Sequence, residues 1–564
     1  MTDKIRKGFL AIAFVFITFG FMHSTNVYAE DMMGHPVMEN VLDIPEINEG
    51  EDSTLPRYGA SYPRRYDPRE SGKVTSIKDQ GSYNTCWAFS IISSIESNLI
   101  KKGIVDNTID LSENHLTYYF YNRKADSLKY TNNDKNTAVR DKWYNNGGTL
   151  MGASIALTTW SGITTENTSK YLSVPGKNIC YKHDYVVKNV YRYNYSVNTI
   201  KQAVKKYGAV ATGMYMGEEY YNAGNGAYYC NKDDGNHAVS IVGWDDDYSR
   251  NNFNSSCRPG SDGAWIAKNS YGRSFGDNGY IYISYEDKSL DELMAYDVIK
   301  EKDSYDNNYQ HDGSASCVYT YRFNNGTKAA NIFTAKAAGK YNEILKAVSV
   351  NTYTTNVKYS LQIYTGLTDS SDPESGTAMF SKPQTGTMKE AGYNQITLKK
   401  PVTLAAGEKF SVVFKFSSSD NEVKIGIDKT YNGSWVKFQA YAGSKRSFVN
   451  LGYRWTDSGA SAGAILRIKA YTDNTKTVPS YKISRKKMSL TAGKSVKLSV
   501  TARPSSVKRS IKWSSSNKKV AQVSSNGTVK AKSKGTAEIK AKFIAGGSVK
   551  VFKCKVTVKP LKKK

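Results

Sequence analysis

Cys86 is the residue of this chain whose surroundings could give it chemistry. It lies in "QGSYNTCWAFS", where Asn84 and Thr85 favour a helix start and Trp87 and Phe89 begin an apolar run. A thiol is a good nucleophile only as thiolate, and a helix N-terminus or a neighbouring imidazolium lowers its pKa from about 8.5. From this stretch alone, Cys86 could be a core residue, half of a disulfide or a nucleophile.

A nucleophilic Cys86 needs a histidine, and His237 is the best placed of the six in the chain. It follows "DDGN" and precedes "AVSIVGW", so it opens a predicted strand and can face a cleft. His115, in "LSENHL", is predicted to lie in the first turn of a helix capped by Ser112, which is a structural position. A third group must hold the imidazole ring, and Asn269 in "KNSYG" is the candidate.

Five segments resemble those of papain-like cysteine peptidases and follow that family's order over about residues 60–290. "QGSYNTCWAFS" is similar to the nucleophile segment, "NHAVSIVGWD" to the histidine segment and "WIAKNSYG" to the asparagine segment. "DLSENHL" and "NNGGTLMGASIALTTWSGI" resemble family segments that lie between the first two. His237 lies 151 residues beyond Cys86, and Asn269 lies 183 beyond it. We assign the long interval between His237 and Asn269 to an insertion within Asp246–Gly263.

The resemblance implies a role for each of these residues. Cys86 would attack the carbonyl carbon of a peptide bond, His237 would hold the thiolate as an ion pair and then protonate the leaving amine, and Asn269 would orient the imidazole. Gln80 would donate its amide N–H to the oxyanion, together with the backbone N–H of Cys86. The substrate backbone would lie close to a glycine pair, Gly147 and Gly148.

Three positions depart from the family pattern. Tyr83 stands where the family has the first cysteine of a disulfide, and Asn145 replaces the partner, so both halves of that disulfide are absent. The catalytic chemistry does not need this disulfide. Tyr271 stands where the family commonly has a tryptophan that shields the imidazole contact from water, so we expect weaker shielding.

Two other functions are consistent with parts of the sequence. A surface-binding protein with an inactive papain-like domain would be expected to have lost part of the catalytic set, whereas all of it is present. A peptidoglycan amidase of the other Cys/His fold lacks the "QGS…CWAF" and "KNS.G" patterns. The acidic clusters Asp233–Asp234 and Asp245–Asp247 are predicted to be solvated turns, and we expect neither a metal site nor a cofactor.

The N-terminal part of the chain is predicted to be processed. Residues 1–29 combine a basic start, an apolar run of about fifteen residues and the small-x-small pattern "VYA", which is typical of a signal peptide. An uncleaved anchor would need about 20 apolar residues. Residues 30–55 are acidic and lack periodicity, which favours a short propeptide or a disordered lead. Residues 56–300 mix helix and strand patterns and make up the predicted peptidase domain.

The rest of the chain has the pattern of β-structure. Residues 314–472 contain strand-like runs separated by Gly, Asn and Asp, which predicts an all-β sandwich. Residues 481–559 resemble a bacterial Ig-like domain of group 2, through "SLTAGKSVKLSVTA" and "VAQVSSNGTVKAKSKGTAEIKA". The predicted fold is therefore multidomain, with an α+β papain-like catalytic domain followed by two all-β sandwiches. Within the family, this order is most similar to bacterial surface peptidases that carry a lectin-like domain.

The charge and the cysteine content limit which partners and which disulfides we expect. Residues 479–564 hold 24 Lys and Arg and one acid, Glu538, so this segment contributes +23 of the net charge of +27. We expect protein or peptide substrates, and association of the basic module with anionic cell-wall polymers rather than with nucleic acid. No membrane span is expected after signal cleavage. The six cysteines are widely spaced, which does not indicate a disulfide scaffold.

Overall fold

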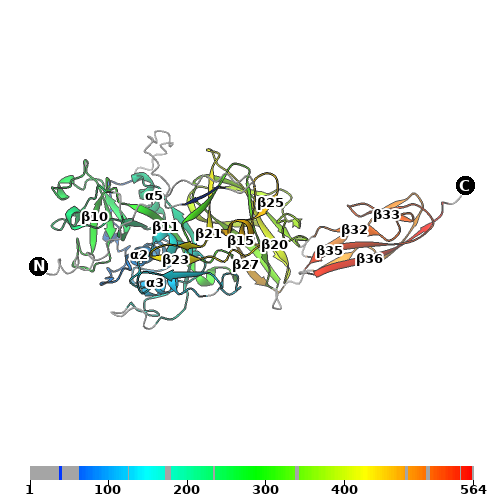
Figure 1. The fold of residues 1–564 in the computed structure, drawn as a ribbon, viewed down its shortest axis with the longest axis horizontal. Coiled ribbons are helices and arrows are strands. Elements are labelled where there is room, and N and C mark those ends of the chain that lie inside the picture. The colour runs from blue at the N-terminus through cyan, green and yellow to red at the C-terminus, as the bar shows by residue number, and fades with distance from the viewer. Residues whose placement is uncertain are drawn as a thin grey trace.

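The computed structural model describes residues 37–40, 62–124, 126–171, 179–232, 235–336, 342–476, 480–503, 509–545 and 548–561. Figure 1 shows an α+β domain, a β-sandwich and a small β-domain in a row, in chain order. The α+β domain followed by two β-domains confirms the predicted fold class. The predicted signal peptide lies outside the described residues, as does the lead segment except 37–40. In the described part of the chain, no helix combines the length and the apolar character that crossing a membrane requires.

α2 (Cys86–Lys101) is the central helix of the first domain. It begins after Thr85, as the sequence predicted, and is followed by Gly103 with a φ of 66°. All residues from Trp87 to Leu99 are buried. The reason is that α2 packs against strands β8 (His237–Asp245) and β11 (Asp291–Lys300) and also against neighbouring helices. The other helices of this domain are α3 (Glu113–Tyr121), α4 (Leu150–Thr158) and α5 (Val197–Tyr207).

The β-rich half of the first domain is antiparallel around β8. β8 pairs with β5 and β9, β9 pairs with β10, and β11 pairs with β4 and β5. The chain between β8 and β9 is the segment assigned above to an insertion, so its length does not disturb the pairing. The other strands of this half are β2 (Arg65–Tyr66), β4 (Tyr185–Arg192), β5 (Val210–Met214), β6 (Tyr221–Asn222), β7 (Ala227–Tyr228), β9 (Ala264–Lys268) and β10 (Tyr280–Ser284). β3 (Lys135–Ala138) lies outside this sheet and pairs with a strand of the middle domain.

The middle domain is a sandwich of two antiparallel sheets that share one apolar core. The first contains β12 (Asn307–Tyr309), β13 (Tyr319–Phe323), β15 (Asn342–Thr352), β19 (Ala391–Leu404), β21 (Val423–Lys429), β26 (Ala464–Leu466) and β27 (Ile468–Thr475). The second contains β14 (Lys328–Thr334), β16 (Val357–Thr365), β17 (Thr377–Ala378), β18 (Gln384–Met388), β20 (Lys409–Ser417), β24 (Ser447–Asn450) and β25 (Trp455–Asp457). Outside the two sheets lie β22 (Tyr431–Asn432), β23 (Val436–Gln439) and a short helix, α6 (Ser458–Ala462).

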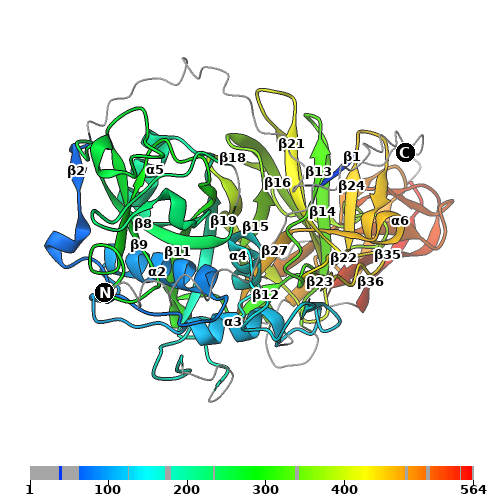
Figure 2. The same ribbon diagram turned by 60° about the vertical axis from the view of Figure 1, so that its left-hand side comes forward.

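The first two domains share backbone hydrogen bonds. β19 of the sandwich pairs with β4 of the first domain, and β23 pairs with β3. The turned view of Figure 2 shows β19 beside the sheet that holds β8, β9 and β11. The lead segment also contributes, because β1 (Val37–Asn40) pairs antiparallel with β13. The sequence predicted no strand there, since pairing to an existing sheet edge requires little periodicity.

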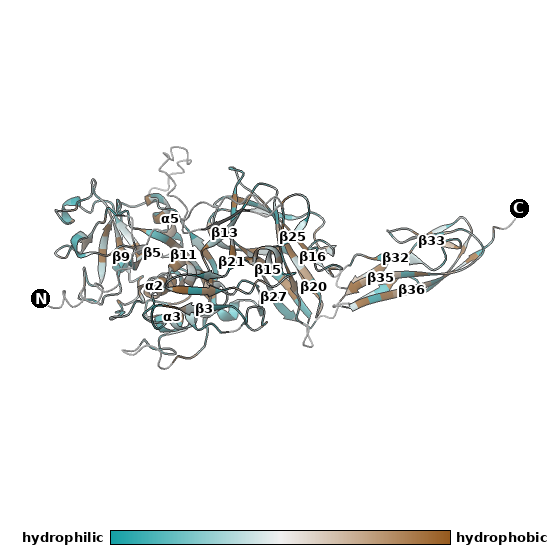
Figure 3. Cartoon of the chain, in the orientation of Figure 1, coloured by the Kyte–Doolittle hydropathy of each residue, from teal (hydrophilic) through white to brown (hydrophobic). Residues whose placement is uncertain are grey.

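The C-terminal domain is a small sandwich whose strands alternate between core and solvent. Figure 3 shows apolar and polar residues alternating along β35 and β36, and alternate residues near the end of β36 are buried. Its buried face includes Leu498, Ile539 and Val556. Its strands are β28 (Ser480–Ile483), β29 (Lys487–Thr491), β30 (Ser495–Lys497), β31 (Val500–Arg503), β32 (Lys512–Ser515), β33 (Ala521–Val523), β34 (Thr528–Ala531), β35 (Gly535–Ala545) and β36 (Ser548–Lys559).

Candidate active site

His237 and Asn269 are brought together by the antiparallel pairing of β8 and β9. His237 is the first residue of β8 and Asn269 follows the last residue of β9, so the two lie at the same end of the hairpin. Asn269 Oδ1 lies 2.8 Å from His237 Nε2 and also accepts the backbone N–H of Ser270 at 2.8 Å. Both side chains are buried. The Asn269 side chain therefore fixes the His237 imidazole at its Nε2 side.

Cys86 meets this pair from the N-terminus of α2. Its thiol is half-buried, and the backbone N–H of Ala238, the neighbour of His237, lowers the pKa of this thiol. Two further contacts fix α2 on β8: Ser90 Oγ donates to the carbonyl of Val239 at 2.5 Å, and the hydroxyls of Ser94 and Ser240 lie 2.8 Å apart. The N-terminus of α2 thus places Cys86 near the end of β8 that begins with His237.

The electrostatics of the site correct one expectation. The helix N-terminus was expected to lower the pKa of Cys86, but burial raises it to about 11, against smaller opposing effects of the backbone N–H groups of Ala238, Trp87 and Cys86. Burial also lowers the pKa of His237 to about 4, although the bond to Asn269 raises it. Burial therefore disfavours the charged form of each of these two groups taken by itself.

Gln80 is locked into the same site. Its Nε2 donates to the carbonyl of Tyr83 at 2.7 Å, and its Oε1 accepts the hydroxyl of Ser270 at 2.6 Å. The Gln80 backbone N–H also donates to the Ser270 carbonyl, at 2.9 Å. Ser270 therefore connects Gln80 with Asn269. This role of Ser270 was not predicted from the sequence, although its position next to Asn269 in "KNSYG" was an available signal.

The glycine pair lies beside the start of α2. Asn84 Nδ2 donates to the carbonyl of Asn145 at 2.7 Å, which joins the two loops. Gly147 has a φ of 83°, in the left-handed region. A Cβ on Gly148 would lie 2.5 Å from the Trp87 indole, so this position needs glycine for packing as well.

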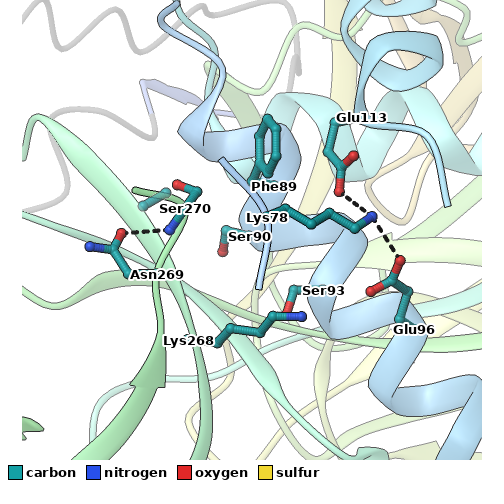
Figure 4. A pocket seen from close by; sticks show the side chains of 10 residues that line it. Lys78, Phe89, Ser90, Ser93, Glu96, Glu113, Lys268, Asn269 and Ser270 are labelled. Carbon is teal, nitrogen blue, oxygen red and sulfur yellow. Dashed lines mark hydrogen bonds and ion pairs between the residues drawn. The ribbon is translucent and has the colours of Figure 1, made fainter. Parts of the chain in front are cut away.

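A cluster of buried charged residues lies next to the site (Figure 4). It was not predicted from the sequence. Lys78 Nζ lies 3.0 Å from Glu96 and 2.8 Å from Glu113. Thr75 links the other carboxylate oxygen of Glu96 to Lys268, the residue before Asn269. Burial raises the pKa of Glu113 to about 8 and lowers that of Lys268 to about 8, so it disfavours the charged form of both groups. The cluster ties α2 to the end of β9.

Comparison with known protein families matches three models: papain family cysteine protease at residues 62–298, lectin like domain at 308–472 and bacterial Ig-like domain (group 2) at 477–552. Residues 62–298 form a papain family cysteine protease domain. The sequence-based resemblance to this family, to a lectin-like domain and to a group 2 Ig-like domain is thereby confirmed.

Solved structures extend the likeness beyond the protease domain. The clostridial cysteine protease Cwp84 after propeptide cleavage is 27% identical with a TM-score of 0.62, over 73% of this chain and 99% of that one. The protease and lectin-like domains of Cwp84, described as a surface layer associated protein of Clostridium difficile, match with the same identity and TM-score over 89% of that chain. The shared arrangement is that of a protease domain followed by a lectin-like domain.

Curated relatives match the protease domain alone. Cathepsin L of Sarcophaga peregrina is 26% identical over 236 residues, which is 40% of this chain and 60% of the relative. Cathepsin S of Bos taurus is 30% identical over 232 residues, 39% of this chain and 59% of the relative. The chain thus spans about three fifths of the length of these two relatives.

Two further features of the protease domain bear on its chemistry. Tyr271 lies against His237, with its hydroxyl 3.2 Å from Nδ1. His115 is buried after its Ser112 cap, as predicted for a structural position, and its ring lies 4.6 Å from that of Tyr119. Among the described residues, no group of three or more His, Cys, Asp or Glu side chains could hold a metal ion.

Proposed function

We propose that this protein is an exported cysteine endopeptidase that hydrolyses peptide bonds through Cys86, His237 and Asn269. The observation that carries the proposal is the meeting of the α2 and β8 termini. There Cys86 begins α2 and His237 begins β8, Ser90 Oγ of α2 donates to the Val239 carbonyl of β8, and His237 Nε2 lies 2.8 Å from Asn269 Oδ1. A thiol, a base and a group that orients the base are the minimum set for nucleophilic catalysis by cysteine.

The proposed reaction begins with proton transfer from the Cys86 thiol to Nδ1 of His237. The thiolate attacks the carbonyl carbon, and the oxyanion takes hydrogen bonds from the Cys86 backbone N–H and from Gln80. The imidazolium returns its proton to the amide nitrogen as the C–N bond breaks, which leaves a thioester on Cys86. Water then loses a proton to His237, attacks the thioester and releases the carboxylic acid and the thiol. Gly147 and Gly148 would border the substrate backbone.

The proposed place of action is the cell surface. The C-terminal module carries most of the positive charge of the chain, and a basic surface attracts polyanions such as anionic wall polymers. The likeness to Cwp84, a surface layer associated protein, supports the same location. Protein or peptide substrates follow from the protease domain.

Labelling with a thiol-reactive peptide probe tests the catalytic proposal. The wild-type protein should be labelled at Cys86 and should cleave peptides, whereas Cys86→Ala should lose both properties with unchanged thermal unfolding. Cys180→Ala is the matched control, because Cys180 is an exposed free cysteine of the same domain. Retained cleavage by Cys86→Ala would refute the proposal. Absence of both labelling and cleavage in the wild type would favour a surface-binding protein with an inactive protease domain.

A further inference from the structure

β11 begins with a bulge that changes the direction in which its first residues face. Gly213 of β5 pairs with Asp291. Ala211, two residues earlier in β5, pairs with Met294, so three steps along β11 correspond to two steps along β5. Glu292, within this bulge, has a φ of 43°, which is uncommon for a residue other than glycine. Bulges are frequent next to active sites, where they re-aim a side chain.

The bulge connects Glu292 with the loop of the glycine pair. Its Oε2 accepts the backbone N–H groups of Leu150 at 2.7 Å and of Met151 at 3.3 Å, the first two residues of α4. An acid at this position is stabilised by the unpaired N–H groups of the helix N-terminus. Because α4 begins two residues after Gly148, the start of β11 is fixed beside the loop that we propose to border the substrate backbone.

The same bulge places Asp291 in one row with the strand that carries His237. Gly213 pairs with Asp291 on one side and with Ala238 on the other. Residues directly opposite one another in antiparallel strands lie on the same face of the sheet. On this face, Ala238 packs in the apolar cluster that also contacts Cys86. Because neighbouring strands are about 4.8 Å apart, Asp291 lies about 10 Å from Ala238 across the sheet.

The carboxylate of Asp291 lies over two glycines near His237. A Cβ added to Gly213 would lie 1.9 Å from Asp291 Oδ1, and one added to Gly235 would lie 3.8 Å from Oδ2. The carboxylate therefore fills the space that a side chain at position 213 would occupy. The Thr212 hydroxyl donates to the Asp291 carbonyl at 2.8 Å, which holds the backbone of this exposed residue in place.

We propose that Asp291 is a specificity-determining residue that binds a lysine or arginine side chain of the substrate close to the scissile bond. The inference rests on the proposed peptidase function and names the substrate class of the same site. A substrate whose carbonyl lies at Cys86 and whose backbone follows the glycine pair passes this row of residues. Ala238 and Gly213 offer little apolar surface to a substrate side chain, and the carboxylate at the end of the row favours a cationic partner.

Matched peptides that differ at one position test the inference. Each position within three residues of the scissile bond carries either lysine or the uncharged norleucine in otherwise identical peptides. At one of these positions, the wild type should cleave the lysine peptide with about tenfold higher kcat/KM, as expected for a charge-assisted hydrogen bond. This preference should weaken at high salt.

Asp291→Asn keeps the shape of the side chain and removes its charge. It should lower kcat/KM for the lysine peptide far more than for the norleucine peptide, so the ratio between the two should fall toward one. Asp303→Asn is the matched control and should keep the wild-type ratio, because Asp303 is an exposed acid beyond the other end of β11. Asp291→Lys reverses the charge and should make the enzyme favour glutamate over lysine at the same position.

The outcomes separate this inference from the proposed function. Cleavage by the wild type without a preference for lysine at any position would overturn the inference and leave the proposed function intact. The same holds if Asp291→Asn retains the preference, or if it loses activity equally on both peptides, which would indicate a structural role. If the wild type cleaved none of the peptides and Cys86 was not labelled by the peptide probe, the proposed function itself would be wrong.

Discussion

At the scale of single residues, the polarity of each contact to His237 determines which protonation state it favours. Asn269 offers an oxygen, which binds the ring in both states and binds the charged ring more strongly. The Tyr271 hydroxyl lies 3.2 Å from the other ring nitrogen, Nδ1. Each ring nitrogen of His237 therefore has a polar neighbour.

Asn269→Ala should narrow the pH profile of kcat/KM. The bond from Asn269 raises the pKa of His237, so its loss makes the imidazolium release its proton at lower pH. A charge-assisted bond of about 1.5–3 kcal/mol corresponds to a shift of about one to two pH units in the alkaline limb. The rate should fall but remain measurable, because Asn269 orients the base and does not react. An alkaline limb at the wild-type position would contradict this role.

At the scale of elements, the start of α2 is fixed by the loop that carries the glycine pair. Trp87, next to Cys86, is buried and lies over Gly148. The loop 145–149 therefore sets how closely the helix terminus approaches the substrate side of the site. Catalysis depends on such positions to within fractions of an ångström.

Gly148→Ala should destabilise the protease domain and impair activity. The new Cβ would lie 2.5 Å from the Trp87 indole, and overpacking of this kind costs about 1–3 kcal/mol. Gly224→Ala is the matched control, because its Cβ would meet nothing closer than 3.4 Å. Urea unfolding and kcat/KM of the two variants make the comparison. Equal stability of both would show that Trp87 can move without cost.

At the scale of the whole molecule, the three domains are joined by different kinds of contact. Strand pairing between β4 and β19 and between β3 and β23 unites the protease and lectin-like domains. The Ig-like domain is held to the lectin-like domain by a pair of buried charges, Arg509 and Glu408, whose closest atoms lie 2.5 Å apart. Burial raises the pKa of Glu408, against the opposing charge of Arg509.

Arg509→Ala should loosen the Ig-like domain. While the domains stay docked, the substitution leaves Glu408 buried without its cation, which costs about 3–5 kcal/mol. Limited proteolysis should release the module faster than from the wild type, whereas Lys512→Ala, at an exposed position of the same domain, should behave like the wild type. Adding Glu408→Gln should recover much of the loss, because the unpaired charge is then absent. Proteolysis at the wild-type rate would show that the pair does not hold the interface.

A chain truncated after Ser480 should keep its activity on a small soluble peptide and lose retention on walls that bear anionic polymers. The removed segment carries the +23 charge, and the exposed Glu408 becomes hydrated. Retention of the full chain should weaken as the screening length falls from about 10 Å at 0.1 M salt to about 3 Å at 1 M. Pull-down on purified walls at both salt concentrations measures this. Equal retention of the full and the truncated chain would show that the C-terminal module acts only as a spacer.

Much of the candidate site could be predicted because its residues lie in short motifs that can be recognised locally. The motifs predicted that a helix starts at Cys86, that a strand starts at His237 and that the three segments contribute to one site. The buried cluster of Lys78, Glu96 and Lys268 was not predicted, since a charged residue on a helix is ordinarily assigned to solvent. Only the packing of α2 between a sheet and other helices explains why Glu96 is buried.

By itself, the sequence determined the order of domains, the charge of the C-terminal module and the residues able to do chemistry, because each depends on residue types and short spacings. Tertiary structure alone decided the burial of Cys86 and His237 and the contact of the Tyr271 hydroxyl with Nδ1. It also decided that the lectin-like domain shares sheets with the protease domain. Burial and strand pairing across domains arise from groups far apart in the chain, and no local pattern encodes the distance between them.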